Sequence, residues 1–475
     1  MRVAKWPVGI AQKITSVFPG PSPCPLLQGE RGRGEVIFRS ILGLCSWVLL
    51  AGTAVAGEVT YCKDVAPILF KHCAGCHRPG EVGPFSLLSY ADAAKRADFL
   101  VDVTRSRRMP PWKPVLGYGD FVNVRRLSDA ELSTLADWAA AGAPQGSPKD
   151  LPPAPTFPDH GWQLGEPDMV LKMAEPFDVP ASGRDAFRCF VIPLDLATDK
   201  VVSGVEFHPG NRRVVHHALF YLDNSGKARK LDEASPGYGY ASFGGVGFAP
   251  TGGIGGWAPG AGIRKFPEGT GNLVRKGSDL VLQVHYHPDG KPEVDQSELG
   301  VYFVRGPVRH IVASLALGNR DINIPAGDAD YRLTSSYTLP ADVQAVGISP
   351  HMHWLGRDMR VEALLPDGRT EHLIWIKDWD FNWQGQYVYR QMIELPRGTR
   401  LTLSAAYDNS AANPANPSDP PAQVHFGEQT TDEMCFCWVQ FVAARREDYV
   451  DVIRGAWRTI LAPRWLSLPS SAKSK

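Results

Sequence analysis

The spacing of apolar residues changes once along the chain, from helical in the first third to alternating in the remainder. Before residue 147, apolar side chains recur at helical spacing over Asp64–Phe70 and Leu88–Arg105. Ser128 and Glu131 are spaced as a capping box, which begins a third helix. This part of the chain is therefore predicted to form a small all-α domain.

From about residue 163, apolar and polar residues alternate in short runs separated by turn sequences. The stretch Gly244–Gly262 is rich in glycine but lacks the Lys-Ser/Thr pair of a phosphate loop, so we expect an irregular loop there. A last helix is predicted over Glu447–Thr459. The strands that the alternation predicts most clearly are Asp279–His287, Val301–Val304, Met359–Leu365 and Arg400–Ala406.

A chain of 475 residues is too long for one ordinary core. The alternating region covers about 300 residues, which is enough for two sandwiches of roughly 150 residues each. We therefore expect a multidomain protein, with a small all-α domain followed by two all-β sandwich domains. The expected parts are a leader at 1–56, the all-α domain at 57–147, a Pro-rich linker at 148–162, sandwiches at 163–309 and 310–465, and a polar tail at 466–475.

The leader has the features of an export signal. Arg39 precedes the apolar stretch Ile41–Val55, and Ala54-Val55-Ala56 fits a small-residue cleavage site. The apolar stretch is shorter than the roughly 20 residues that a membrane span needs. We expect a cleaved signal behind a mis-called start, a periplasmic or extracellular protein, and no integral membrane span in the mature chain. The alternative is an uncleaved anchor.

Charge and cysteine content restrict the function further. Lys+Arg and Asp+Glu both number 50, so the chain has no basic excess to recruit nucleic acid, and no nucleic-acid partner is expected. Beyond the leader, four cysteines lie outside the haem motif described next. An even number in an oxidising compartment permits two disulfides, whose pairing the sequence leaves open. These cysteines are Cys62, Cys189, Cys435 and Cys437.

Cys73-Ala74-Gly75-Cys76-His77 is the C-x-x-C-H pattern of covalent haem attachment. Two thiols form thioethers to the haem, and the adjacent His77 supplies one axial nitrogen. Met109 lies downstream in a proline-bent loop and is the candidate for the second axial ligand; the alternative is a methionine that fills the core. The region resembles a class I cytochrome c domain over about 85 residues, and this resemblance favours Met109. The alternative for the motif is a redox C-x-x-C or a chance match.

Six of the thirteen histidines cluster in His216-His217, His285-Tyr286-His287 and His351-Met352-His353. Residues i and i+2 of a strand share a face, so His351 and His353 can bind one ion together. Adjacent histidines point to opposite faces of a regular strand, so His216 and His217 can share an ion only where the backbone bulges or ends. Neutral imidazole suits zinc, copper, iron and nickel, so the histidines alone leave the metal open.

The order of these segments resembles the copper type II, ascorbate-dependent monooxygenases, the class of the peptidylglycine α-hydroxylating and dopamine β-monooxygenases. Val214–His217, Trp257-Ala258-Pro259, Leu282–Tyr286, His351–Gly356 and Asp432–Cys435 match the family's segments collinearly over about 300 residues. The resemblance implies jelly-roll-like sandwiches and two copper ions. It implies that the electron-transfer copper is bound by His216, His217 and His285, and the catalytic copper by His351, His353 and Met434.

The remaining histidines receive other roles. The resemblance offers no counterpart for His287, which is expected to be a surface or outer-shell residue. His425 is expected to lie in the outer shell of the catalytic copper. We expect structural roles for His208, His310 and His372. In the family a cysteine beside the ligand Met forms a disulfide, so Cys435 is implied in one, with its partner open.

The sequence also departs from the family at the substrate site. The peptidylglycine enzymes have an Arg two residues before the H-x-H to hold the substrate carboxylate, where this chain has Ser349. Phe436 and Trp438 stand where those enzymes have Asn and Tyr. The resemblance therefore implies O2-dependent hydroxylation of a C–H bond in a small molecule other than a peptide C-terminus.

The expected cofactors are two copper ions and one covalently attached haem c, and turnover needs an external electron donor, either an ascorbate-like reductant or a redox protein. Two other classes remain open. A non-catalytic copper-binding or electron-transfer protein is compatible with the missing substrate clamp. A zinc hydrolase would need a carboxylate base, and none lies within the histidine patterns.

Overall fold

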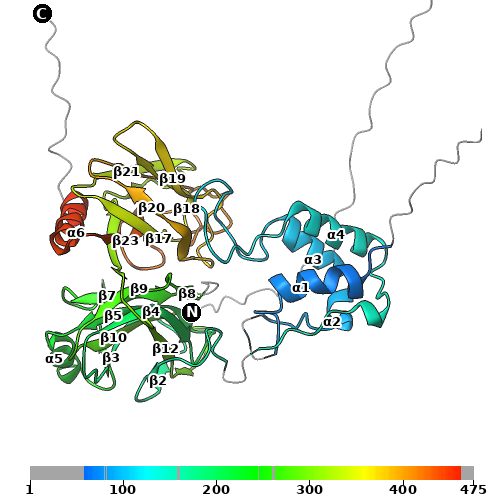
Figure 1. Ribbon diagram of the computed structural model, residues 1–475, viewed down its shortest axis with the longest axis horizontal. Helices are drawn as coiled ribbons and strands as arrows, with labels where there is room; N and C mark the ends of the chain where they lie inside the picture. The colour runs from blue at the N-terminus through cyan, green and yellow to red at the C-terminus, as the bar shows by residue number, and fades with distance from the viewer. Residues whose placement is uncertain are drawn as a thin grey trace, which may run out of the picture. The chain divides into compact units, whose positions relative to one another are not determined.

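A computed structural model describes residues 58–461 except 80, 82, 158–160, 244 and 259–262. The expected leader, its cleavage site and the polar tail lie outside the described residues. The described chain is mostly β, with few helices (Figure 1). No helix among these residues is both long and apolar enough to cross a membrane.

Residues 58–143 contain the predicted helices. The chain runs through η1 (Tyr61–Val65), α1 (Ala66–His72), α2 (Tyr90–Ala94), α3 (Ala97–Arg105) and α4 (Asp129–Ala140). The predicted helix Leu88–Arg105 is divided into α2 and α3 at Lys95 and Arg96. The predicted capping box is confirmed, because Ser128 Oγ accepts from Glu131 N and Glu131 Oε2 accepts from Ser128 N. The helices pack around a core that includes Tyr61, Leu69, Leu135 and Trp138.

The first β unit has two main sheets. One has the order β1-β12-β4-β9-β13, with β8 beside β4, and the other has the order β6-β3-β10-β5-β7. Both sheets contribute to one hydrophobic cluster, in which Val205 comes from β4 and Leu282 from β10, so the sheets form a sandwich. The strands are β1 (Met169–Lys172), β2 (Phe177–Val179), β3 (Ala186–Pro193), β4 (Lys200–His208), β5 (Val215–Asp223), β6 (Tyr240–Ala241), β7 (Gly252–Trp257), β8 (Arg264–Lys265), β9 (Thr270–Val274), β10 (Asp279–Tyr286), β11 (Glu293–Asp295), β12 (Glu298–Phe303) and β13 (His310–Ile311), with helix α5 (Lys227–Glu233) after β5.

The second β unit is also a sandwich. Its sheets have the orders β14-β23-β17-β20 and β16-β21-β18-β19, and residues of both, such as Val439 and Val361, share one core. Helix α6 (Arg446–Leu461) contains the predicted helix Glu447–Thr459. The strands are β14 (Ala313–Gly318), β15 (Asn323–Ile324), β16 (Tyr331–Thr338), β17 (Val343–His351), β18 (Gly356–Leu364), β19 (Thr370–Ile376), β20 (Tyr387–Leu395), β21 (Arg400–Tyr407), β22 (Val424–His425) and β23 (Phe436–Ala443).

The four strands that the alternation predicted most clearly are confirmed as β10, β12, β18 and β21. The prediction of an irregular loop over Gly244–Gly262 is wrong in part, because Gly252–Trp257 forms β7 and pairs with β5. Four of its six residues are glycines, which have no side chain to be apolar or polar, so the strand leaves no alternation in the sequence. A Cβ on Gly256 would lie 2.7 Å from Leu219 Cδ2 and 3.0 Å from the backbone oxygen of Ala218, so close packing against β5 favours glycine here.

The segment that follows α3 was not expected to join a β unit. Val115 N donates to Trp375 O and Val122 N donates to Val388 O, both at 2.9 Å. Phe121 is 2% exposed and lies in the core of the second β unit. The segment Trp112–Val122 therefore extends from the helical region onto the ends of β19 and β20.

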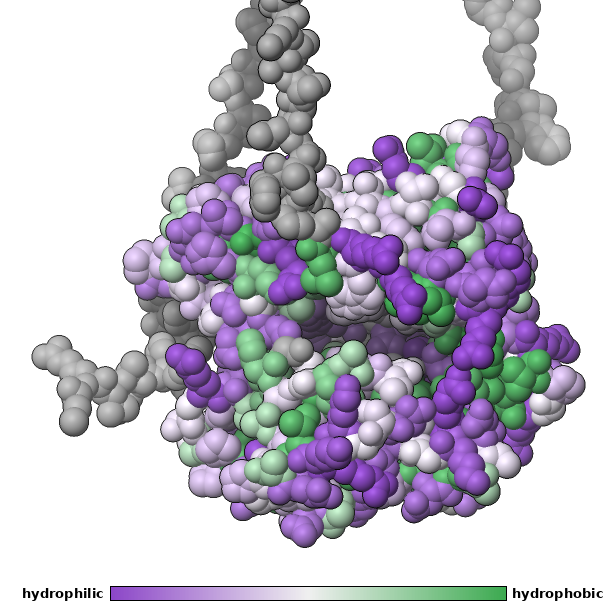
Figure 2. All heavy atoms as spheres, turned by 90° about the vertical axis from the view of Figure 1, so that its left-hand side faces the viewer, coloured by the Kyte–Doolittle hydropathy of each residue, from purple (hydrophilic) through white to green (hydrophobic). Residues whose placement is uncertain are grey.

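The face of the molecule in Figure 2 carries mainly hydrophilic residues, with apolar residues scattered among them, and it is hollowed across its middle. No broad apolar patch covers the part of this face that is drawn in colour.

Candidate functional site

The first histidine set lies on two neighbouring strands of the first β unit. His216 and His217 begin β5, and His285 is near the end of β10. His285 pairs with His217, but the next residue of β10, Tyr286, pairs with Val215. His216 is therefore the extra residue of a β-bulge, which is the condition under which adjacent histidines can face one ion.

The Nδ1 atoms of these three histidines converge. His217 Nδ1 lies 3.2 Å from His216 Nδ1 and 3.3 Å from His285 Nδ1. One ligand atom of each histidine lies within 4.8 Å of the others, as the donors to a single metal ion do. Burial is the main cause that lowers the pKa of His216 to about 3, and the neighbouring His285 lowers it further. His216 and His217 are thus held neutral, the form that binds metals.

Asp185 contacts the first histidine set on the side of the His285 ring that faces away from the converging Nδ1 atoms. Its Oδ2 lies 3.0 Å from His285 Nε2 and its Oδ1 lies 2.7 Å from His287 Nδ1. Thr430 Oγ1 also donates to Asp185 Oδ2 at 3.1 Å. Burial would raise the pKa of Asp185, but its contacts with His285 and His287 lower it below its usual range. A carboxylate on the distal nitrogen orients a ligating histidine.

The sequence provided no signal for Asp185, because it lies far in sequence from His285. His287 is 63% exposed at its side chain, in agreement with the surface position expected for it, and it touches Asp185.

The second histidine set lies at the end of β17. His351 is the last residue of β17, pairs with Phe436 of β23, and is followed by His353. The two imidazole centroids are 5.2 Å apart. His351 Nδ1 lies 2.6 Å from Gln384 Oε1, and His353 Nδ1 lies 3.0 Å from Asp432 O.

These hydrogen bonds determine which nitrogen of each ring can bind a ligand. The acceptors are oxygens, so both Nδ1 atoms carry the proton, and the lone pair of each ring is on Nε2. Gln384 Nε2 donates to Phe381 O at 3.0 Å, which fixes the orientation of the Gln384 amide. The two sets thus offer different nitrogens, Nδ1 in the first and Nε2 in the second.

Glu433 joins the H-x-H segment to the segment that contains Met434. Its Oε2 accepts from His353 N at 2.9 Å and from Met434 N at 3.1 Å, and its Oε1 accepts from Leu355 N at 2.7 Å. Burial raises the pKa of this carboxyl to about 8. Met434 is further held by Tyr407, whose hydroxyl donates to Met434 O. The backbone of Met434 is therefore fixed beside His353, and its side chain packs against the cluster of Ala316, Phe436 and Ile460.

Aromatic residues lie beside the second set. The Trp438 ring lies 5.9 Å from the His351 ring and stacks on Phe436 at 5.8 Å. Ser349 Oγ accepts from Gln440 Nε2 at 3.3 Å. Position 349 is thus occupied by a short side chain that is hydrogen-bonded within the protein.

The C-x-x-C-H segment directly follows α1. His77 Nδ1 lies 3.1 Å from Phe85 O, so the proton is on Nδ1 and Nε2 is the donor atom for a metal. A Cβ on Gly83 would lie 2.8 Å from His77 Nδ1, so glycine is needed where this loop passes the ring. Cys73, Cys76 and His77 thus offer the two thiols that thioether attachment of a haem would use and the imidazole that would bind its iron. Met109 is half-buried after α3, where its N donates to Val103 O.

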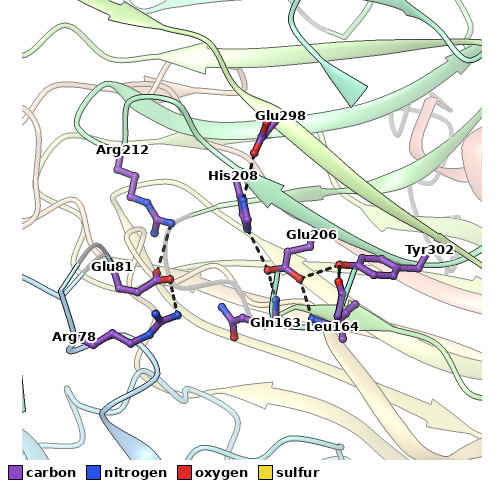
Figure 3. A network of polar contacts seen from close by, with 10 residues as sticks. Arg78, Glu81, Gln163, Leu164, Glu206, His208, Arg212, Glu298 and Tyr302 are labelled. Carbon is purple, nitrogen blue, oxygen red and sulfur yellow. Dashed lines mark hydrogen bonds and ion pairs between the residues drawn. The ribbon is translucent and has the colours of Figure 1, made fainter. Parts of the chain in front are cut away.

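A polar network connects the loop after this motif to the first β unit (Figure 3). Glu81 contacts Arg78 at 2.8 Å and Arg212 at 3.5 Å, and Arg212 lies four residues before His216. Nearby, buried Glu206 accepts from Gln163 N and Leu164 N and contacts His208. These contacts anchor the start of the first sandwich and the loop that precedes the first histidine set.

The other histidines lie apart from the two sets. His208 stacks on Trp162 at 3.8 Å, and His372 contacts Glu362 at 2.9 Å, as expected for structural residues. His310 begins β13, and its N donates to Gly269 O. His425 is exposed on β22, and its carbonyl accepts from Glu433 N.

The six cysteines of the described chain form no disulfide. Cys62 lies in the core of the helical region, Cys189 in a small cluster of the first β unit, and Cys435 and Cys437 in the core of the second. The two disulfides that the count permits are not formed in this structure.

Comparison with known proteins identifies no family. No family model matches the chain, and no curated protein matches it. Among solved structures, the VP2 subviral particle of infectious bursal disease virus matches with 8% identity and a TM-score of 0.18, over 61% of this chain and 75% of that one. The Gx strain of this virus matches with 8% identity and a TM-score of 0.18, over 60% and 74%. Likenesses this weak carry no argument about fold or function.

Proposed function

We propose that this chain is an exported copper-dependent monooxygenase that hydroxylates a C–H bond with O2 and receives electrons through a covalently attached haem. The observation that carries the proposal is the pair of unlike histidine sets. Three Nδ1 atoms converge in one. In the other, two histidines with bonded Nδ1 atoms stand beside the Met434 backbone. Two further points support a copper-dependent monooxygenase. The ordered histidine and methionine motifs resemble those of the copper monooxygenases, and the chain has the two β-sandwiches that this resemblance implies.

The donor atoms fit copper. His216, His217 and His285 would hold one ion, and His351, His353 and Met434 would hold the other. A thioether favours reduced copper, whereas three imidazoles serve either oxidation state. The two bound coppers, once reduced by the external donor, would supply one electron each and the activation of O2. The overall reaction places one oxygen atom in the substrate and releases the other as water, which consumes two electrons and two protons.

The chain's own residues prepare this chemistry. Asp185 orients His285, and Gln384 orients His351. Glu433 keeps His353 and Met434 together through its backbone hydrogen bonds. The aromatic pair Phe436 and Trp438, together with the short Ser349, favours an apolar substrate over one with a carboxylate.

Cys73, Cys76, His77 and Met109 would hold the haem, which would carry single electrons from an external donor. Attachment to the same chain raises the effective concentration of such a carrier to about the millimolar range. The alternative is that the haem region only docks another carrier. Faster reoxidation of reduced haem in copper-loaded than in copper-free protein under O2 would support internal delivery, and equal rates would contradict it.

The decisive experiment measures metal content and O2 uptake of purified, haem-loaded protein with ascorbate as reductant. The expected result is two coppers per chain and uptake that depends on an added apolar substrate. His351→Ala should keep one copper and lose uptake, whereas His287→Ala should keep both coppers and the uptake. Two coppers without uptake for any substrate class would favour a non-catalytic copper-binding or electron-transfer protein. Bound zinc in place of copper would favour a hydrolase.

A further inference from the structure

Phe381 is buried between the two histidine sets. It lies on the loop 377–386 that joins β19 to β20 and is 5% exposed. Its ring stacks on His216 at 4.7 Å with an interplanar angle of 23°. The same ring meets the edge of His353 at 5.6 Å. One side chain of the second sandwich therefore contacts a histidine of each set.

The surroundings of Phe381 distinguish it from a core residue. It belongs to none of the hydrophobic clusters of the described chain, although it is as buried as their members. Its ring neighbours in the described chain are His216, His353 and Trp354. A phenyl ring that is buried against imidazoles contributes contact area and ring orientation more than apolar packing.

The loop itself is tied on several sides, so the ring has a fixed position. Trp379 Nε1 donates to His353 O at 3.1 Å. Gln386 Nε2 donates to Gly256 O at 2.9 Å, and Gly256 belongs to β7, the neighbour of the strand that carries His216. Lys113 Nζ contacts Asp378 and Asp380 at 3.4 and 3.6 Å. The loop thus connects the two sandwiches and the segment that follows Met109.

We propose that Phe381 is a positioning residue that orients His216 within the first set and fixes the separation of the two sets. Stacking restrains the plane of the His216 imidazole, which directs its Nδ1 toward those of His217 and His285. Contact with His353 through the same ring keeps the two sets no farther apart than one phenyl ring allows. The proposal rests on the two-metal function proposed above.

The test compares wild type with Phe381→Leu, which keeps apolar volume but removes the ring, and with Phe441→Leu as a matched control. Phe441 is fully buried in the core of the second sandwich, outside both sets. The first measurement uses metal-free protein, with ¹³C at the histidine Cε1 position. The His216 resonance should show a ring-current shift that Phe381→Leu removes and Phe441→Leu retains.

The second measurement titrates Cu(II) into the same three proteins and records electron paramagnetic resonance. Wild type should bind two coppers, and a pulsed measurement of their through-space dipolar interaction should give one narrow copper–copper distance. Phe381→Leu should bind copper at the first set roughly tenfold more weakly and broaden that distance distribution. Unchanged affinity and an unchanged distance distribution in Phe381→Leu would overturn the proposal while leaving the two-copper function intact. Failure of wild type to bind two coppers would instead remove the proposed function.

Discussion

Asp185 and His285 are 100 residues apart in the chain, yet Asp185 Oδ2 lies 3.0 Å from His285 Nε2, on the side of the ring opposite the converging Nδ1 atoms. The same carboxylate contacts His287 through its other oxygen. A carboxylate in this position increases the basicity of the ligating nitrogen and holds the ring plane. Asp185 was not part of the histidine motifs found in the sequence, and its substitution tests this role directly.

We expect Asp185→Asn to weaken copper binding at the first set by about 10- to 100-fold. The amide keeps the shape but loses the charge that favours a strongly donating imidazole. Competition with a calibrated Cu(I) chelator measures the affinity of each set. His287→Ala removes the exposed partner of Asp185 and is the control. Equal loss in the two variants would contradict the special role of His285.

Gln384→Leu should weaken the second set by about 10- to 100-fold, because His351 would lose the acceptor that keeps its proton on Nδ1. Gln386→Leu is the matched control for the second set. It changes the same residue type in the same loop, but its amide binds Gly256 O and not His351, so the number of imidazoles at the second set should stay the same. Copper titration followed by X-ray absorption at the copper edge reports the number of bound imidazoles. If Gln384→Leu leaves the copper affinity and the number of bound imidazoles at the second set unchanged, His351 does not depend on its hydrogen bond to Gln384.

Phe121→Ala should destabilise the second β unit by about 3–5 kcal/mol, the usual cost of removing a buried phenyl ring. Phe121 lies between α3 and α4 of the helical region in sequence, but its ring stacks on Tyr389 at 5.1 Å inside the sandwich core. Urea unfolding followed by tryptophan fluorescence measures the change. Leu116→Ala alters an exposed residue of the same segment and should be near neutral. A neutral Phe121→Ala would mean that the segment does not stabilise the sandwich.

Acid should weaken the helical region through Glu131. Burial would raise the pKa of Glu131, but hydrogen bonds from Ser128 and His72 lower it to about 2. A carboxyl whose pKa is lowered by folding stabilises the protein above its ordinary pKa, and that contribution is lost as pH falls from about 4.5 toward 2. Circular dichroism across this range should show the loss of helix in wild type.

Glu131→Gln should lack most of this pH dependence, because the amide does not titrate. An acid transition of the same size in Glu131→Gln would assign the effect to other carboxyls.

Ser128→Ala should lower the free energy of unfolding by about 1 kcal/mol at neutral pH, since it removes the side chain that caps α4.

Local patterns determined the parts of the protein that depend on residues close in sequence. The Ser128–Glu131 capping box and the alternation in β10 each act within a few residues, so they could be predicted without a structure. The neighbouring His216 and His217 required a bulge to face one ion, and this condition followed from the two-residue period of strands.

The tertiary structure alone decided which residues support the histidines. Asp185, Gln384 and Phe381 reach His285, His351 and His216 across 100, 33 and 165 positions, and no period or motif connects such residues. Strand β7 was likewise hidden, because its glycines have no side chains to alternate. Sequence fixes local dihedral preferences and which faces are apolar, whereas the pairing of distant strands and the loops between them determines which polar groups meet.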